Sequence, residues 1–312
     1  MAHNPSLIDV APPISGFREF ISIYVLEADR SALVDVGPSV SVKNLVSGLK
    51  GLGINLADIS YIFATHIHID HAGGIGKAIE QMPNARVVVH AKGGPHLIDP
   101  AKLWEGSKQA LGQQALKYQS IAPVPEDRII IAEDGMRFDL GGVEIEALDT
   151  PGHAPHNLSF LDRKEGRLFA GDAAGVYVRK VDLIRPATPT PFNLEQALDS
   201  LDKLISLKLT NLCYTHFGCT EQALEQLQRS KRQLLLWGKI IAGCLEEEAC
   251  YQDIFTKVRE NDNTLAPIDR LPKAQRDREL FFIENSITGF IGYFKRYGTD
   301  YMKSIADKKD SS

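Results

Sequence analysis

Short apolar runs and amphipathic stretches alternate along the first part of the chain. Two β-rich runs around a polar turn predict a hairpin over residues 20–36. Helical spacing of apolar positions predicts helices over residues 40–52 and 75–82, the second ending at Pro83. Compact β-branched runs predict strands over residues 59–64 and 86–90. The start of the chain therefore shows a β-α-β-α-β alternation.

The middle of the chain is richer in strands, and the last third is helical. An insertion with helical periodicity covers residues 101–117, and a second helix covers residues 193–207. Short apolar runs bounded by Gly, Asp or Pro predict strands over residues 128–132, 143–148, 157–161, 167–170 and 211–214. After Thr220 the pattern predicts helices over residues 221–248, 251–259 and 274–297. We therefore expect an α/β domain over residues 1–219 and a helical region over residues 220–312.

Composition narrows the class without identifying a function. The 312 residues are 44% hydrophobic and 24% charged, which is typical of a globular protein. The net charge of −5 argues against a general nucleic-acid binder. The first thirteen residues lack the basic and apolar parts of a signal peptide, and no apolar stretch reaches the roughly 20 residues of a membrane span. We expect a cytoplasmic protein with no membrane partner.

Four cysteines lie in the last third of the chain, at positions 213, 219, 244 and 250. Their two C-x5-C spacings match no zinc-binding pattern. In the expected intracellular setting, buried free thiols are favoured over a metal site or a disulfide.

The segment that suggests chemistry reads THIHIDHAGG over residues 65–74, directly after a predicted strand. On extended backbone, residues two apart face the same side, so His66 and His68 can reach one metal ion. Asp70 and His71 follow where the chain begins to turn and can reach a second ion close by. The glycines at 73, 74 and 76 allow the backbone conformations of this turn.

Three later segments each place one donor directly after an apolar strand: TPGH ending at residue 153, AGD ending at residue 172 and YTH ending at residue 216. Loops at strand ends hold side chains on a rigid scaffold within reach of a substrate. The resulting hypothesis has two metal sites joined by one carboxylate. The first site comprises His66, His68 and His153, the second comprises Asp70, His71 and His216, and Asp172 bridges them.

Together with an acidic motif, LVDVG over residues 33–37, this pattern resembles the metallo-β-lactamase superfamily over residues 18–218. The resemblance implies a four-layer αβ/βα sandwich, here with a helical C-terminal extension. It also implies that Asp35 orients the histidine loop through hydrogen bonds, a simple turn cap being the alternative. The motifs look like those of the glyoxalase II and lactonase-like branch, although residues 151–157 depart from the glyoxalase II pattern, which argues against glutathione thioesters.

The implied activity is hydrolysis of an ester, thioester or lactone of a small molecule by a dinuclear metal enzyme. Two cations about 3.5–4 Å apart would share a water and lower its pKa toward ~7. Asp70 would hold the proton of the hydroxide and then help to protonate the leaving group. Zinc suits these ligands best, and iron or manganese fit the same donors. Three alternatives stay open: a mononuclear iron persulfide dioxygenase, a ribonuclease of the same superfamily, and a metal-binding protein without turnover.

Residues near the expected ligands are candidates for substrate contacts: Tyr177, Arg179, Tyr214 and His156. Tyr177 and Arg179 alternate along an extended segment after Asp172, and Tyr214 would share one strand face with His216. Trp104 and Leu111 on the insertion could line a hydrophobic entrance. The aromatic face over residues 281–294 would pack on the α/β body or form a homodimer through the C-terminal helices.

Overall fold

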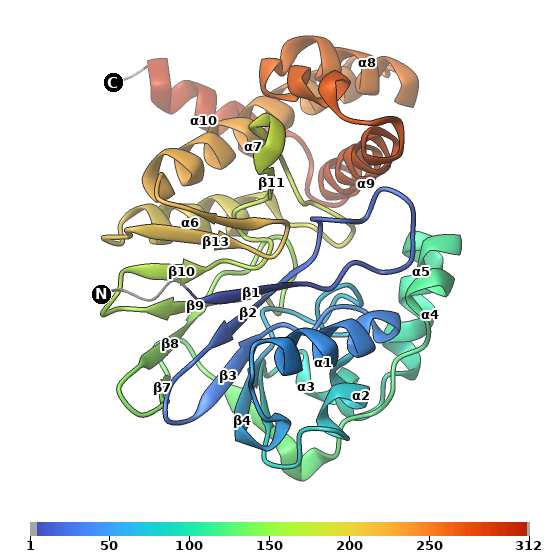
Figure 1. Cartoon of the computed structure of the whole chain (residues 1–312). Helices are drawn as coiled ribbons and strands as arrows, with labels where there is room; N and C mark the ends of the chain where they lie inside the picture. Colours follow the sequence, from blue (N-terminus) through green and yellow to red (C-terminus); the bar gives the residue numbers. More distant parts are fainter. Residues whose placement is uncertain (1–4, 311–312) are drawn as a thin grey trace.

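The computed structural model describes residues 5–310, in which two six-stranded sheets face each other (Figure 1). The first sheet has the order β1-β2-β3-β4-β5-β6, antiparallel from β1 to β3 and parallel from β3 to β6. Its strands are β1 (Ser6–Asp9), β2 (Ser22–Leu26), β3 (Ser31–Val34), β4 (Ile59–Phe63), β5 (Arg86–His90) and β6 (Ile129–Ala132). These strands include the predicted hairpin and the predicted alternation.

The second sheet has the order β14-β13-β10-β9-β8-β7, and only β10 and β13 pair in parallel. Its strands are β7 (Arg137–Asp139), β8 (Glu144–Asp149), β9 (Leu158–Asp162), β10 (Arg167–Phe169), β13 (Asn211–Tyr214) and β14 (Gly218–Thr220). A separate hairpin is formed by β11 (Val176–Val178) and β12 (Leu183–Arg185).

Helices cover the outer face of each sheet, with α1 and α2 on one side of the sandwich and α6 and α7 on the other (Figure 1). The α-helices are α1 (Val42–Gly51), α2 (Ile75–Ile79), α3 (Gly94–Ile98), α4 (Ala101–Leu111), α5 (Gln113–Tyr118), α6 (Leu194–Ile205), α7 (Ala223–Glu246), α8 (Tyr251–Asn261), α9 (Lys273–Tyr297) and α10 (Asp300–Asp310). Short 3-10 helices are η1 (Ser39–Ser41), η2 (Leu56–Asp58), η3 (Glu126–Arg128), η4 (Arg179–Val181) and η5 (Asn263–Arg270).

Three clusters of buried side chains correspond to the interfaces between the four layers. The central cluster lies between the sheets and includes Phe63 from the first sheet and Phe160 from the second, with ring centroids 4.9 Å apart. A second cluster joins the first sheet to α1 and α2. The third joins the second sheet to α6 and to the C-terminal helices, around Trp237 and Phe290. The predicted four-layer sandwich with a helical C-terminal region is therefore confirmed.

The C-terminal aromatic residues pack on the α/β body. Phe290, Tyr293 and Phe294 are buried in the cluster that contains the second sheet, whereas Phe281 is 37% exposed. The proposed division of the chain at residue 219 and the homodimer stay predictions. None of the helices within residues 5–310 has the length and apolar character needed to cross a bilayer.

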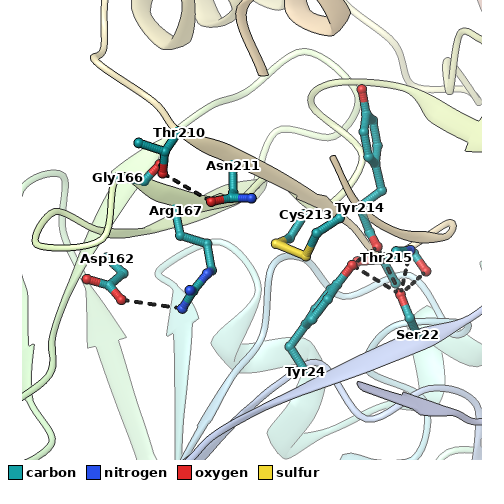
Figure 2. The surroundings of a disulfide bond; sticks show 12 residues. Ser22, Tyr24, Asp162, Gly166, Arg167, Thr210, Asn211, Cys213, Tyr214 and Thr215 are labelled. Carbon is teal, nitrogen blue, oxygen red and sulfur yellow. Dashed lines mark hydrogen bonds and ion pairs between the residues drawn. A yellow bond between two sulfur atoms is a disulfide. The ribbon is translucent and has the colours of Figure 1, made fainter. Parts of the chain in front are cut away.

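The structure corrects two expectations. The single helix expected over residues 101–117 is two helices, because Gly112 has φ of +54°, a conformation that ends α4. The expectation of four free thiols is also wrong, because Cys213 and Cys219 form a disulfide (Figure 2). The strands β13 and β14 pair antiparallel with these two cysteines directly opposite, so their side chains meet. Cys244 is a buried free thiol and Cys250 an exposed one.

Candidate metal centre

The side chains predicted to bind metal come from loops at the ends of strands in both sheets. His66 and His68 follow β4, and Asp70 and His71 lie in the turn before α2. His153, Asp172 and His216 follow β8, β10 and β13, in that order. The turn after β4 is tight, since a Cβ at Gly73 would lie 2.3 Å from the Ile69 carbonyl oxygen. Glycine is therefore required there.

Three histidine nitrogens converge at the first predicted site. The His66 Nε2 atom lies 3.0 Å from His68 Nδ1 and 3.2 Å from His153 Nε2, and His153 Nε2 lies 2.9 Å from His68 Nδ1. These separations suit three nitrogens of one tetrahedral zinc with bonds of about 2.0–2.1 Å.

Hydrogen bonds on the far side of the rings assign which nitrogens are free to bind a cation. His153 donates its Nδ1 proton to the Ala187 carbonyl at 2.7 Å, and His216 donates its Nδ1 proton to the Phe20 carbonyl at 2.7 Å. In the neutral rings, both Nε2 atoms therefore present a lone pair to the site. Such partners are typical of metal-binding histidines, whose orientation they fix.

Asp70, His71 and His216 form a second group whose donor atoms lie within 4.8 Å of one another. The His216 Nε2 atom is 3.6 Å from the Asp70 carboxylate. Asp172 lies between the two groups: its Oδ1 is 3.4 Å from His71 Nε2, and its Oδ2 is 3.7 Å from His153 Nε2. The structure thus brings together all seven side chains expected as ligands, with Asp172 reaching both groups.

The electrostatics of the two groups fit a bound cation. Burial holds the pKa of His153 down at about 3, and burial lowers the pKa of His66, His68 and His216 well below the usual range, so these rings are neutral. Burial alone would also lower the pKa of His71, but Asp172 and Asp35 raise it to about 9. His71 Nε2 and Asp172 Oδ1 are buried without a hydrogen-bond partner. A divalent ion would supply the positive charge and the contacts that these atoms lack.

Asp35 lies beneath the second group and is fully buried. Its carboxylate accepts hydrogen bonds from His71 Nδ1 at 2.9 Å, from the Thr65 backbone N–H at 2.8 Å and from the Thr215 hydroxyl at 3.1 Å. Asp35 therefore contacts both histidine-bearing loops, one from each sheet, and holds His71 with Nε2 directed at Asp172.

A cavity of about 430 Å³ opens above the two groups. Its lining includes His68, Asp70, His153, Asp172 and His216, and also His156, whose ring centroid lies 5.8 Å from that of His68. Leu111 borders the cavity as expected for the entrance, whereas Trp104 is not among its lining residues.

The structure corrects the expectation that Tyr177, Arg179 and Tyr214 face this cavity. Strand β13 ends at Tyr214, so the alternation that would align it with His216 breaks there. The Tyr214 ring is fully buried and packs on Tyr177 at 5.6 Å between centroids. Arg179 is exposed in η4 and borders a different depression, near Cys219.

The sequence analysis missed a buried charge cluster beside the cavity. Arg185 and Arg278 both pair with Glu279, with Nε–oxygen distances of 2.5 and 2.7 Å, and all three side chains are at most 3% exposed. Arg185 lines the cavity. Arg278 and Glu279 are adjacent in the sequence, whereas Arg185 lies 94 residues before Glu279, and no local motif links them.

A two-sheet sandwich with histidine and aspartate clusters at its strand ends is the architecture of a class of metal-dependent enzymes. The comparison with family models specifies that class: residues 16–216 match the Lactamase_B model, so the chain belongs to the metallo-beta-lactamase superfamily and is an enzyme of that superfamily.

One relative supports this membership, and one solved structure shares the fold. A metallo-beta-lactamase fold-containing protein of Sulfurisphaera tokodaii is 30% identical over 207 residues, which are 65% of this chain and 74% of that protein. A metallo-beta-lactamase family protein of Thermus thermophilus matches with a TM-score of 0.68 at 22% identity, over 94% of this chain and 93% of the other.

Two relatives carry names of hydrolases. An N-acyl homoserine lactonase of Agrobacterium fabrum is 30% identical over 120 residues, 38% of this chain and 41% of that protein. An atrochrysone carboxyl ACP thioesterase of Aspergillus fumigatus is 27% identical over 187 residues, 57% of this chain and 47% of that protein.

Proposed function

We propose that this enzyme uses two divalent metal ions, with zinc as the preferred metal, to hydrolyse an ester, thioester or lactone of a small molecule. The observation that carries the proposal is the pair of donor groups on either side of Asp172, each with three ligand atoms within 4.8 Å of one another. Relatives named as a lactonase and as a thioesterase support the substrate class.

The donors divide into two sets in this proposal. His66, His68 and His153 hold the first ion, Asp70, His71 and His216 hold the second, and Asp172 contacts both. Divalent ions held there would supply Lewis acidity and a water of lowered pKa. The mixture of imidazole and carboxylate donors suits zinc, and also iron or manganese.

The remaining chemistry belongs to side chains of the chain itself. Asp70 borders the cavity and is 16% exposed, compared with 8% for Asp172. Its carboxylate can therefore accept a proton from the attacking water and pass it to the leaving oxygen or sulfur. His156 borders the same cavity, so its ring is placed to contact the substrate.

The test is a turnover assay of zinc-loaded enzyme with an aryl ester, an acyl thioester and a γ-lactone. We expect hydrolysis of at least one of them, loss of activity after dialysis against a chelator, and recovery on adding zinc. Hydrolysis that survives complete metal removal would contradict the proposal. Absence of hydrolysis, together with oxygen consumption by iron-loaded enzyme on a glutathione persulfide, would replace it with a dioxygenase function.

A further inference from the structure

The cavity above the metal centre is bordered mainly by hydrocarbon beyond the predicted ligands. We propose that it binds an apolar acyl group of the substrate between α4 and α9, with the scissile carbonyl beside His153 and Asp172. This inference rests on the proposed hydrolase function. A volume of about 430 Å³ lies within the range of cavities that enclose small-molecule ligands, roughly 300–1,000 Å³.

One side of the cavity is a stripe along α4, which we call the α4 wall: Leu103, Gly106, Ser107, Ala110 and Leu111. These positions recur every three or four residues and so share one helix face. No residue of α4 is fully buried. Leu103 and Leu111 pack only partly against the core, and the rest of the stripe borders an open cavity. An apolar ligand there would cover the part that stays exposed.

Aromatic side chains from distant segments form the opposite side. Phe282 of α9 and Phe20 stack with ring centroids 5.5 Å apart, and both border the cavity. The Arg185 guanidinium lies 5.0 Å from the Phe282 ring centroid. Val176 and Pro189 extend this surface. Because the rings pack on one another and on a paired arginine, this side is fixed in place and offers a flat apolar contact.

The charges around the cavity argue against a charged acyl group. Among the described residues that line it, Asp70 and Asp172 are the only carboxylates, and both belong to the predicted metal centre. Arg185 is engaged by Glu279, and Lys102 is exposed. The described lining therefore leaves no buried, unpaired charge on the cavity sides to bind a charged acyl chain, so a neutral hydrocarbon chain matches this lining best.

Gly106 offers a precise way to shorten the cavity. A Cβ at this position would meet no atom within 4 Å, although Gly106 borders the cavity. A larger side chain there enters the space proposed for the acyl chain without disturbing the helix. Gly243 in α7 also has no atom within 4 Å of a Cβ and does not border the cavity, so Gly243→Leu is a matched control.

The experiment measures kcat/KM of zinc-loaded wild type, Gly106→Leu and Gly243→Leu on p-nitrophenyl acetate, butyrate and octanoate. Burying one methylene favours binding by about fourfold, so wild type should prefer octanoate to acetate by at least ~10-fold. Gly106→Leu should lower kcat/KM for octanoate by about 10-fold or more, and should change kcat/KM for acetate by less than about twofold. Gly243→Leu should match wild type. Equal kcat/KM of the wild type for all three esters would overturn the inference. An equal effect of Gly106→Leu on all three esters would overturn it as well.

Binding of octanamide, measured by calorimetry, separates this inference from the proposed hydrolysis. We expect octanamide to bind wild type at least ~10-fold more tightly than acetamide and to lose this advantage in Gly106→Leu. If no ester is hydrolysed but this pattern holds, the hydrolase proposal fails and the apolar site stands. If esters are hydrolysed but octanamide binds no more tightly than acetamide, the proposed apolar site is contradicted and the hydrolase proposal stands.

Discussion

The cavity floor and the α4 wall differ in how firmly the structure holds them. The cavity floor, which we define as His66, His68, Asp70, His71, His153, Asp172 and His216, comes from strand ends of both sheets, and its rings are fixed by Ala187, Phe20 and Asp35. The α4 wall lies on a helix with no fully buried residue, which ends at Gly112. From this difference we expect the floor to determine the chemistry, and the wall to tolerate changes that alter substrate preference without disturbing the fold.

The largest effect should come from removing the carboxylate shared by the two groups of the floor. We expect Asp172→Ala to lower kcat/KM by about 10³-fold for every acyl chain. Removing the carboxylate should cost several kcal/mol of transition-state stabilisation, and each ~1.4 kcal/mol lowers the rate tenfold. Metal content per chain should fall as well. The assay uses the p-nitrophenyl ester series, with metal analysis of the same samples.

Asp127→Ala provides the control, because Asp127 is exposed in η3 and does not line the cavity. Unchanged turnover in Asp172→Ala would contradict the role of the shared carboxylate. A loss confined to long acyl chains would remove the distinction between the floor and the wall.

The next effect concerns stability rather than chemistry, at Glu279 of α9 beneath the aromatic side of the cavity. Burial would raise the pKa of Glu279, but the Arg185 and Arg278 guanidiniums outweigh it and hold that pKa below its ordinary value. At pH 7 we expect Glu279→Gln to lower the free energy of unfolding by about 3–5 kcal/mol, because it leaves buried cations unpaired.

The pH dependence of that difference follows from the direction of the shift. A carboxyl with a lowered folded-state pKa stabilises the fold fully above its unfolded value of about 4.3 and loses this contribution as the pH falls through the folded value. The gap between wild type and Glu279→Gln in urea unfolding should therefore close on acidification. The exposed Glu260→Gln in α8 is the control, and a gap that widens in acid would refute the assignment.

The smallest effect should come from Asp35, which contacts the floor from below. Asn suits the Asp35 backbone, whose φ is +59°, and keeps the shape of the side chain. Asp35→Asn should weaken metal affinity by about 10–100-fold, as is typical for partners of metal-binding histidines. Competition with a chromophoric chelator measures the affinity, with the exposed Asp58→Asn as control. Equal affinity in both variants would make Asp35 a turn cap only.

The floor was predictable because the side chains expected as ligands follow recognisable strands. His66 and His68 share one face of an extended segment, and His153, Asp172 and His216 each follow a short apolar run. Periodicity also predicted most strands and helices of the sandwich. The strands β1, β7 and β14 were missed, because each has three or four residues with at most two apolar positions, which is too little pattern to be recognised. The β11-β12 hairpin was also missed.

The rest of the cavity depends on contacts between distant segments, which no local pattern encodes. Arg185 and Glu279 are 94 residues apart and meet only because α9 packs beside β12. Tyr214 was misplaced because the strand ends at Tyr214, whereas the alternation assumed extended backbone as far as His216, two residues further on. Cys213 and Cys219 pair because of a two-strand register that the spacing of the cysteines does not reveal.

The metal content per chain tests the central claim of two metal sites most directly. The protein should be purified without chelator or metal-affinity resin and analysed by inductively coupled plasma mass spectrometry against its measured concentration. Two sites joined by Asp172 predict close to two equivalents of divalent metal, predominantly zinc. A reproducible value near one equivalent of iron, unchanged by incubation with excess zinc, would contradict the dinuclear hydrolase.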